Sequence, residues 1–140
     1  MELSETEKAY IAGIIDGEGC IGIYQNTVGR FGLRLDIANT FEELLIWLSS
    51  KLDQKYYQFV NKEPNWKVLH CVGLEGKRVK ELLEQVSPYL IIKKRQAEVA
   101  LEFPILSTRP SEEEELQQAV CCVKMKSLNK RGKPEEDAIK

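Results

Sequence analysis

The chain has 140 residues, of which 43% are hydrophobic and 30% are charged, and its formal net charge at pH 7 is -2. This length and balance predict one soluble globular domain that can bury a core without disulfides or metal ions. No apolar run approaches the roughly 20 residues that cross a bilayer, so a membrane-spanning protein is excluded.

The amino terminus and the cysteines favour an intracellular protein, cytoplasmic or organellar. The first ten residues, MELSETEKAY, are acidic where a secretory signal would be basic and then apolar. The four cysteines include no C-x-x-C pair, and the chain has one histidine, His70, so a zinc site is not expected. We expect reduced thiols that act as small apolar side chains.

The charge distribution leaves nucleic-acid binding open. A net charge of -2 counts against it. Acidic residues concentrate in Glu2–Glu7 and Glu112–Glu115, however, whereas many lysines and arginines lie between Arg30 and Arg95. A surface with one basic face is compatible with this order.

A helix is predicted from Glu5 to Asp16, ended by Gly17 and Gly19. Ser4 followed three residues later by Glu7 is the pattern of a capping box. Apolar residues at helical spacing predict a face that packs on the core, and they are Ile11, Ile14 and Ile15.

The same helix carries a ridge of small residues and ends in acid. The ridge consists of Ala9, Ala12, Gly13 and Gly17, and it would let another backbone approach closely. Asp16 and Glu18 lie at the helix end among glycines, so at least one carboxylate can project there as a ligand for a hard metal ion. An ordinary amphipathic helix with a glycine stop is the alternative interpretation.

The stretch from Ile11 to Gly19, IAGIIDGEG, resembles the LAGLIDADG motif of homing endonucleases position by position, with Ile for Leu and Glu for the final Asp. In that family two copies of the helix pack together through small residues, and the last acidic residue of each binds a divalent cation. The resemblance therefore implies a metal role for Glu18. It also implies that Ala9, Ala12, Gly13, Asp16 and Gly17 face a second copy of the chain.

Two period-two segments, Cys20–Asn26 and Phe31–Asn39, predict a hairpin around a turn at Asn26–Gly29. Alternation places Ile21, Ile23, Phe31, Leu33, Leu35 and Ile37 on one face. The other face is polar and includes Tyr24, Asn26, Arg30, Arg34 and Asp36. These five residues either read DNA bases in the major groove or simply face solvent.

A helix capped by Thr40 is predicted from Phe41 to Leu52. The segment from Ile37 to Leu45 also resembles the family, in which the residue matching Asn39 contacts metal-bound water; local turn chemistry is the alternative. At Glu43 some relatives carry a basic residue. A second hairpin follows over Lys55–Lys62 and Trp66–Leu74, with a turn at Glu63–Asn65. Its last strand is apolar on both faces, so the direction of Lys67 and His70 stays open.

A helix over Lys77–Val86 is predicted to break at Ser87 and Pro88, and the next helix to end near Phe103. The block SPYLIIKKRQA is similar to a family segment whose active-site lysine falls at Lys93. A lysine beside a scissile phosphate stabilises developing negative charge or polarises the attacking water. The alternative is a basic helix start that meets solvent or phosphate.

The last predicted helix spans Glu112–Leu128, and a charged, flexible tail follows. We therefore expect one domain at 1–128 and a tail at 129–140. The element order predicts an α+β fold, and the resemblance implies an antiparallel four-stranded saddle sheet backed by helices.

The resemblance, over roughly Lys8 to Ala97, implies an intron-encoded type of double-stranded DNA endonuclease that uses Mg²⁺, or Mn²⁺ or Ca²⁺ in vitro. Since the chain carries one motif copy, a homodimer cutting a palindromic or near-palindromic site is expected. An RNA-binding intron maturase and a non-catalytic DNA-binding regulator are the alternatives.

Overall fold

The computed structural model describes residues 1–60 and 67–130. In chain order its elements are α1 (Glu5–Glu18), β1 (Gly19–Gln25), β2 (Phe31–Asn39), α2 (Glu42–Leu52), β3 (Tyr57–Phe59), β4 (Leu69–Glu75), α3 (Lys77–Val86), the 3-10 turn η1 (Ser87–Tyr89), α4 (Lys94–Glu102) and α5 (Glu112–Asn129). The predicted turn at residues 63–65 and the tail from residue 131 lie outside the described residues. No helix within the described part is long and apolar enough to span a membrane.

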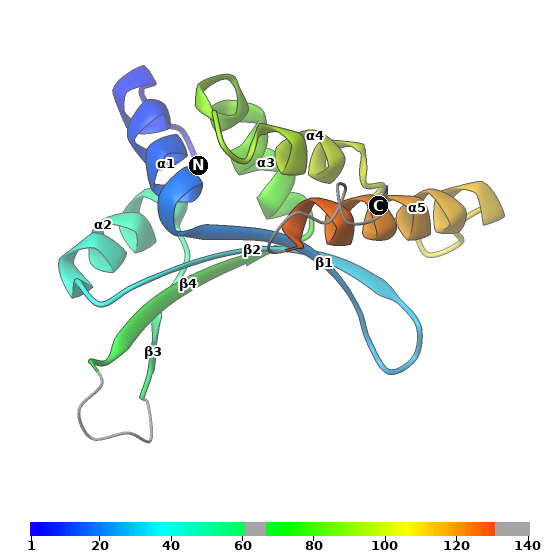
Figure 1. Cartoon of the computed structure of the whole chain (residues 1–140), viewed down its shortest axis with the longest axis horizontal. Coiled ribbons are helices and arrows are strands. Elements are labelled where there is room, and N and C mark those ends of the chain that lie inside the picture. The colour runs from blue at the N-terminus through cyan, green and yellow to red at the C-terminus, as the bar shows by residue number, and fades with distance from the viewer. Residues whose placement is uncertain (61–66, 131–140) are drawn as a thin grey trace, which may run out of the picture.

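The strands form one antiparallel sheet in the order β1-β2-β4-β3. Figure 1 shows the helices gathered on one face of this sheet and the other face open between two arms, the β1–β2 hairpin and the β3–β4 pair. The predicted α+β class and four-stranded saddle are therefore confirmed. We call the open side the concave face.

The predicted alternation of the first hairpin is correct. Ile21, Ile23, Leu33, Leu35 and Ile37 are buried under the helices, and Gly22 pairs with Arg34 and Cys20 with Asp36 on the concave face. The hydrophobic core lies between the sheet and the helices. All five α-helices contribute buried side chains to it, among them Ile15, Leu48, Leu82, Ala100 and Cys121. Helix α5 thus belongs to the same core as α1.

Helix α1 begins where the sequence predicts and ends two residues later. The Ser4 side chain accepts a hydrogen bond from the Glu7 backbone N–H, and the Glu7 carboxylate accepts one from Ser4 N–H. The helix runs through Gly17 to Glu18 instead of stopping at Asp16. A Cβ atom on Gly19 would lie 2.9 Å from the Ile15 Cα. Only glycine therefore allows the first residue of β1 to pack this closely against the last turn of α1.

The predicted cap of α2 is wrong. Phe41 occupies the N-cap position, and no side chain caps the helix through Thr40. The Asn39 Oδ1 accepts a hydrogen bond of 2.8 Å from the Phe41 N–H, which shapes the turn ahead of the helix and does not cap it. A bond from an asparagine side chain to the N–H two residues later is typical of an Asx turn.

The second hairpin is shorter on its outer side than predicted, since β3 holds only Tyr57–Phe59. The structure decides the phase of β4. Val72 and Leu74 face the core, and His70 shares their side and is buried, whereas Cys71 and Glu75 share the concave side with Arg34. Lys67 is exposed just ahead of β4.

Candidate active site and nucleic-acid interface

The end of α1 carries two acidic side chains in different environments. Glu18 is the last residue of the helix and is exposed. Asp16 is half-buried, and its carboxylate accepts hydrogen bonds from the backbone N–H groups of Ile91, Ile92 and Lys93, at 2.9, 3.1 and 2.9 Å. Glu18 is therefore the carboxylate at this helix end that is available to a ligand.

The Asp16 carboxyl has a lowered pKa. Burial acts to raise it, but the three backbone N–H donors, with the nearby Lys93 charge, outweigh burial and hold the pKa below its ordinary value. Asp16 is thus an anion that ties the chain ahead of α4 to the motif helix. The resemblance assigned it to a partner-facing surface, yet both its oxygens are engaged within its own chain.

Lys93 also joins the segment ahead of α4 to the end of α1. Its Nζ donates to the backbone carbonyls of Ile15 and Asp16, at 3.0 and 2.9 Å, and so caps the last turn of α1 with a positive charge. The fold therefore brings Lys93 to the helix end that carries Glu18. A lysine ammonium has three N–H donors, so one remains for a further acceptor.

Asn39 lies at the end of β2, on the helix side of the sheet, opposite His70 in the register. Its Oδ1 is occupied by the Phe41 N–H. The turn chemistry that we considered as an alternative is therefore present, and a contact with metal-bound water stays a prediction.

The small-residue ridge of α1 is divided between two faces. Ala9, Gly13 and Gly17 are exposed, and a Cβ atom on Gly13 or Gly17 would meet nothing within 4 Å in this chain. Ala12 is fully buried in the chain's own core, so its assignment to a partner-facing surface is wrong. One residue of helix corresponds to about 100°, which separates Ala12 from Gly13.

The centre of the concave face is a network of ions. Arg34 Nε donates to both carboxylate oxygens of Asp36, at 2.8 Å each, and its Nη1 donates to Glu75 Oε1. Hydrogen bonding to Asp36 raises the pKa of Arg34, burial opposes this rise, and the charge of Glu75 and the Tyr57 hydroxyl add to it. Arg34 and Asp36 thus share the predicted face, but as one unit that includes Glu75.

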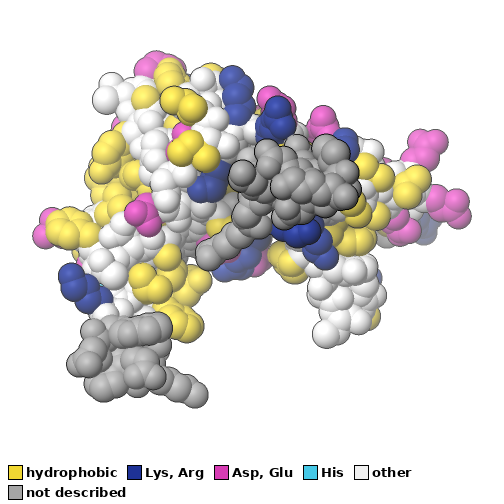
Figure 2. Space-filling model, in the orientation of Figure 1, with side chains coloured by type: hydrophobic (Ala, Val, Ile, Leu, Met, Phe, Trp, Pro, Cys, Tyr) yellow, Lys and Arg dark blue, Asp and Glu magenta, His cyan; other side chains and the backbone are white. Residues whose placement is uncertain are grey.

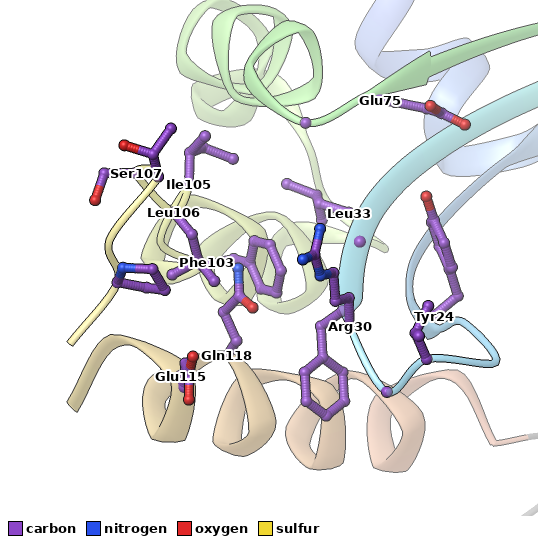
Figure 3. Close-up of a pocket in the computed structure, with 17 residues that line it drawn as sticks. Tyr24, Arg30, Leu33, Glu75, Phe103, Ile105, Leu106, Ser107, Glu115 and Gln118 are labelled. Atoms are coloured by element: carbon purple, nitrogen blue, oxygen red, sulfur yellow. The ribbon is translucent and has the colours of Figure 1, made fainter. Parts of the chain in front are cut away.

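The other predicted DNA-binding residues lie toward the hairpin tip. The Tyr24 ring covers Gly32, where a Cβ atom would come 2.4 Å from its Cζ. Asn26 Oδ1 accepts hydrogen bonds from the N–H groups of Val28 and Arg30 and so shapes the turn. The sequence prediction places Arg30 on the concave face with Arg34; in the structure Arg30 lines a cleft that Phe103 and Gln118 also line (Figure 3).

No protein-family model matches the chain, and no curated protein matches it. Its structure is similar to that of the homing endonuclease I-CvuI in complex with its target, with a TM-score of 0.73 and 19% identity over 96% of this chain and 92% of that one. The archaeal intron-encoded homing endonuclease I-Vdi141I complexed with DNA gives a TM-score of 0.72 and 15% identity, over 91% and 87% of the two chains.

The LAGLIDADG homing endonuclease I-LtrWI bound to target DNA gives a TM-score of 0.58 and 21% identity over 89% of this chain, which spans 45% of that protein. The chain has the LAGLIDADG homing-endonuclease fold. At these identities the likeness establishes the architecture.

Two hollows in this LAGLIDADG fold were not predicted. A cleft of about 1060 Å³ lies between the β1–β2 hairpin, the segment 103–110 and α5, and Figure 3 shows Arg30, Phe103 and Gln118 pointing into it. A smaller hollow lies between α1 and α2 and is lined by Tyr10, Phe41 and Trp47. In Figure 2 hydrophobic side chains gather over the α1 and α2 side of the molecule.

Glu75 is the site residue that sequence reasoning missed. It follows the apolar stretch of β4, and the phase of that strand was ambiguous, so no pattern placed it beside Arg34. Its position opposite Arg34 depends on the pairing register of β2 with β4, which the sequence pattern does not give.

Proposed function

We propose that this chain is a site-specific double-stranded DNA endonuclease that works as a homodimer with a divalent cation. The observation that carries the proposal is the end of α1: a LAGLIDADG-like helix ends in an exposed Glu18, beside glycines that the chain's own side chains leave uncovered, in the LAGLIDADG homing-endonuclease fold. The single domain at 1–128 is part of this proposal.

The donor set fits Mg²⁺ in a shared site better than in a single chain. The described residues of one chain contain no group of three His, Cys, Asp or Glu side chains that could hold a metal ion. Mg²⁺ keeps several waters and commonly takes one or two protein carboxylates. Glu18 and the Glu18 of a second copy supply those carboxylates, and a bound cation there would activate water and screen the phosphate.

Lys93 and Asn39 have supporting roles in this proposal. Lys93 holds the last turn of α1 through two carbonyls and keeps one N–H donor for the negative charge that develops on the phosphate. Asn39 keeps its side-chain N–H₂ group for water near the site, since its Oδ1 is used by Phe41. Asp16 keeps Lys93 in place.

The proposed assembly uses the exposed part of α1. Gly13 and Gly17 leave room for a second backbone, and a two-fold axis there would bring the two Glu18 carboxylates together. Close carboxylates repel, so cation binding and dimer formation would support each other. Two concave faces in a row would then cover a palindromic or near-palindromic DNA site.

A plasmid-library cleavage assay with and without Mg²⁺ tests the proposal. Mg²⁺-dependent cutting at one recurring site is the expected result. Site-specific DNA binding without cutting would instead indicate a regulator. Selective binding of structured RNA with no DNA selectivity would indicate a splicing role.

A further inference from the structure

The ion network on the concave face has a fixed position in the middle of the sheet. Arg34 lies opposite Gly22 on β1 and opposite Glu75 on β4, while Asp36 lies opposite Gly73. The three charged side chains therefore stand on the two central strands. They remain accessible, with 35% of the Arg34 side chain, 38% of Asp36 and 59% of Glu75 exposed.

The charge of the network disfavours a phosphate contact. One guanidinium and two carboxylates sum to -1, and a phosphate approaching Arg34 would have to approach both carboxylates as well. Lysines and arginines that anchor phosphates do so through uncompensated positive charge and release counterions. Arg34 is not an anchor of that kind.

The remaining hydrogen-bonding groups suit a base pair. Arg34 uses Nε for Asp36 and Nη1 for Glu75, the Tyr57 hydroxyl takes a further hydrogen bond from the guanidinium, and Nη2 lies over Gly73. About two of the five guanidinium N–H groups therefore remain for a base. Each carboxylate keeps unused acceptor positions. In the major groove a G·C pair offers the acceptors O6 and N7 on guanine and the N4 amino donor on cytosine, which arginine and carboxylates respectively recognise.

We propose that Arg34, Asp36 and Glu75 form a preassembled reader of one G·C base pair in each half of the DNA target. This inference rests on the proposed function as a DNA endonuclease. Because the two acids hold the guanidinium before DNA arrives, little side-chain entropy is lost when the base pair is read.

Two glycines flank the network and provide matched test variants. A Cβ atom on Gly73 would come 2.7 Å from Arg34 Nη2 and 2.8 Å from Asp36 Oδ1, so Gly73→Ala must push the guanidinium aside. The atoms that move belong to side-chain ends, and the fold should survive. A Cβ atom on Gly22 meets nothing within 4 Å, so Gly22→Ala is the control on the same face.

The experiment selects binding sites for the wild type from randomised DNA duplexes. It then measures competition binding of Arg34→Ala, Glu75→Gln, Gly73→Ala and Gly22→Ala, after thermal melts have verified that each variant folds. We expect Arg34→Ala and Gly73→Ala to reduce the preference for one G·C pair per half-site at least about fivefold. Glu75→Gln should also reduce this preference, because it removes one of the two carboxylates that hold the guanidinium. Gly22→Ala should keep the wild-type preference.

The salt dependence of binding decides between base and phosphate. Loss of a base contact leaves the slope of log K against log [salt] unchanged, whereas loss of a phosphate contact lowers its magnitude by about 1. A lowered slope, an unchanged base preference in Arg34→Ala, or a preference for A·T at that position would overturn the reader. Absence of any selected site for the wild type would instead refute the proposed function itself.

Discussion

Two acidic residues one half-turn apart at the end of α1 have different surroundings. Asp16 accepts three backbone hydrogen bonds and is half-buried, so its charge is already used by its own chain. Glu18 is exposed and lies where the helix passes into β1. A carboxylate that contributes to catalysis must be free to meet a ligand, and that condition favours Glu18.

We expect Glu18→Gln to abolish cleavage and to leave DNA affinity within a few-fold, because it removes a charge from the proposed cation site and almost no contact surface. Cleavage rates and binding constants of the two proteins would be compared at the same Mg²⁺ concentration. Glu84→Gln, on the exposed side of α3, is the control that should retain activity. Near wild-type cleavage by Glu18→Gln would refute the assignment of the metal site.

Lys93→Met should lower the cleavage rate by about 100-fold or more while affecting DNA binding much less, since groups that assist proton transfer or stabilise charge contribute on that scale. Single-turnover cleavage and equilibrium binding are the two measurements. Lys94→Met changes the exposed neighbouring lysine and should be nearly neutral. An equal decrease in binding and cleavage would identify Lys93 as a phosphate anchor.

At the scale of elements, the junction of α1 with the chain ahead of α4 is held by reciprocal contacts. Asp16 receives the N–H groups of residues 91–93, and Lys93 returns two hydrogen bonds to the carbonyls of the last turn of α1. Five hydrogen bonds therefore join the helix that presents Glu18 to the segment that presents Lys93.

Asp16→Asn should destabilise the fold at neutral pH by about 1–2 kcal/mol, since hydrogen bonds to a charged acceptor are lost at a site that solvent partly screens. The Asp16 pKa is lowered in the folded state, so its stabilisation is complete above the pKa of an unfolded aspartate, about 3.9, and is lost as the pH falls through the folded value. Denaturant unfolding at pH 7 and at pH 3 measures this. The difference in the free energy of unfolding between wild type and Asp16→Asn should be smaller at pH 3 than at pH 7. An equal difference at both pH values would contradict a stabilising Asp16 charge.

For the whole molecule, the question is whether two chains meet along α1. Gly13→Leu should eliminate the dimer and cleavage, because leucine fills the space that a second backbone would need. Within one chain a Cβ atom at position 13 meets nothing within 4 Å, and leucine is a better helix former than glycine by about 1 kcal/mol. The isolated variant should therefore melt no lower than an isolated wild-type chain.

Sedimentation with and without DNA measures the assembly. Glu98→Leu, on an exposed site of α4, controls for the added hydrophobic surface and should leave the dimer intact. A wild-type protein that stays monomeric on DNA would refute the two-fold arrangement.

The sequence by itself determined the features that depend on neighbours along the chain. Ser4 and Glu7 start α1 through one capping box, and alternation in Phe31–Asn39 assigns its faces, because both signals are local and periodic. The four-stranded α+β fold followed from the motif and the order of the elements. Where a helix ends was less well predicted, since α1 continues through Gly17.

Only the tertiary structure decided which side chains form hydrogen bonds or ion pairs with residues distant in the sequence. Arg34 is neutralised in part by Glu75, 41 residues away, and Asp16 is bound by the backbone of Lys93, 77 residues away. Ala12 faces the core while Gly13 stays exposed, although both are small. Such pairings depend on strand order, register and helix orientation, which result from packing the whole chain, and a local pattern carries no information about them.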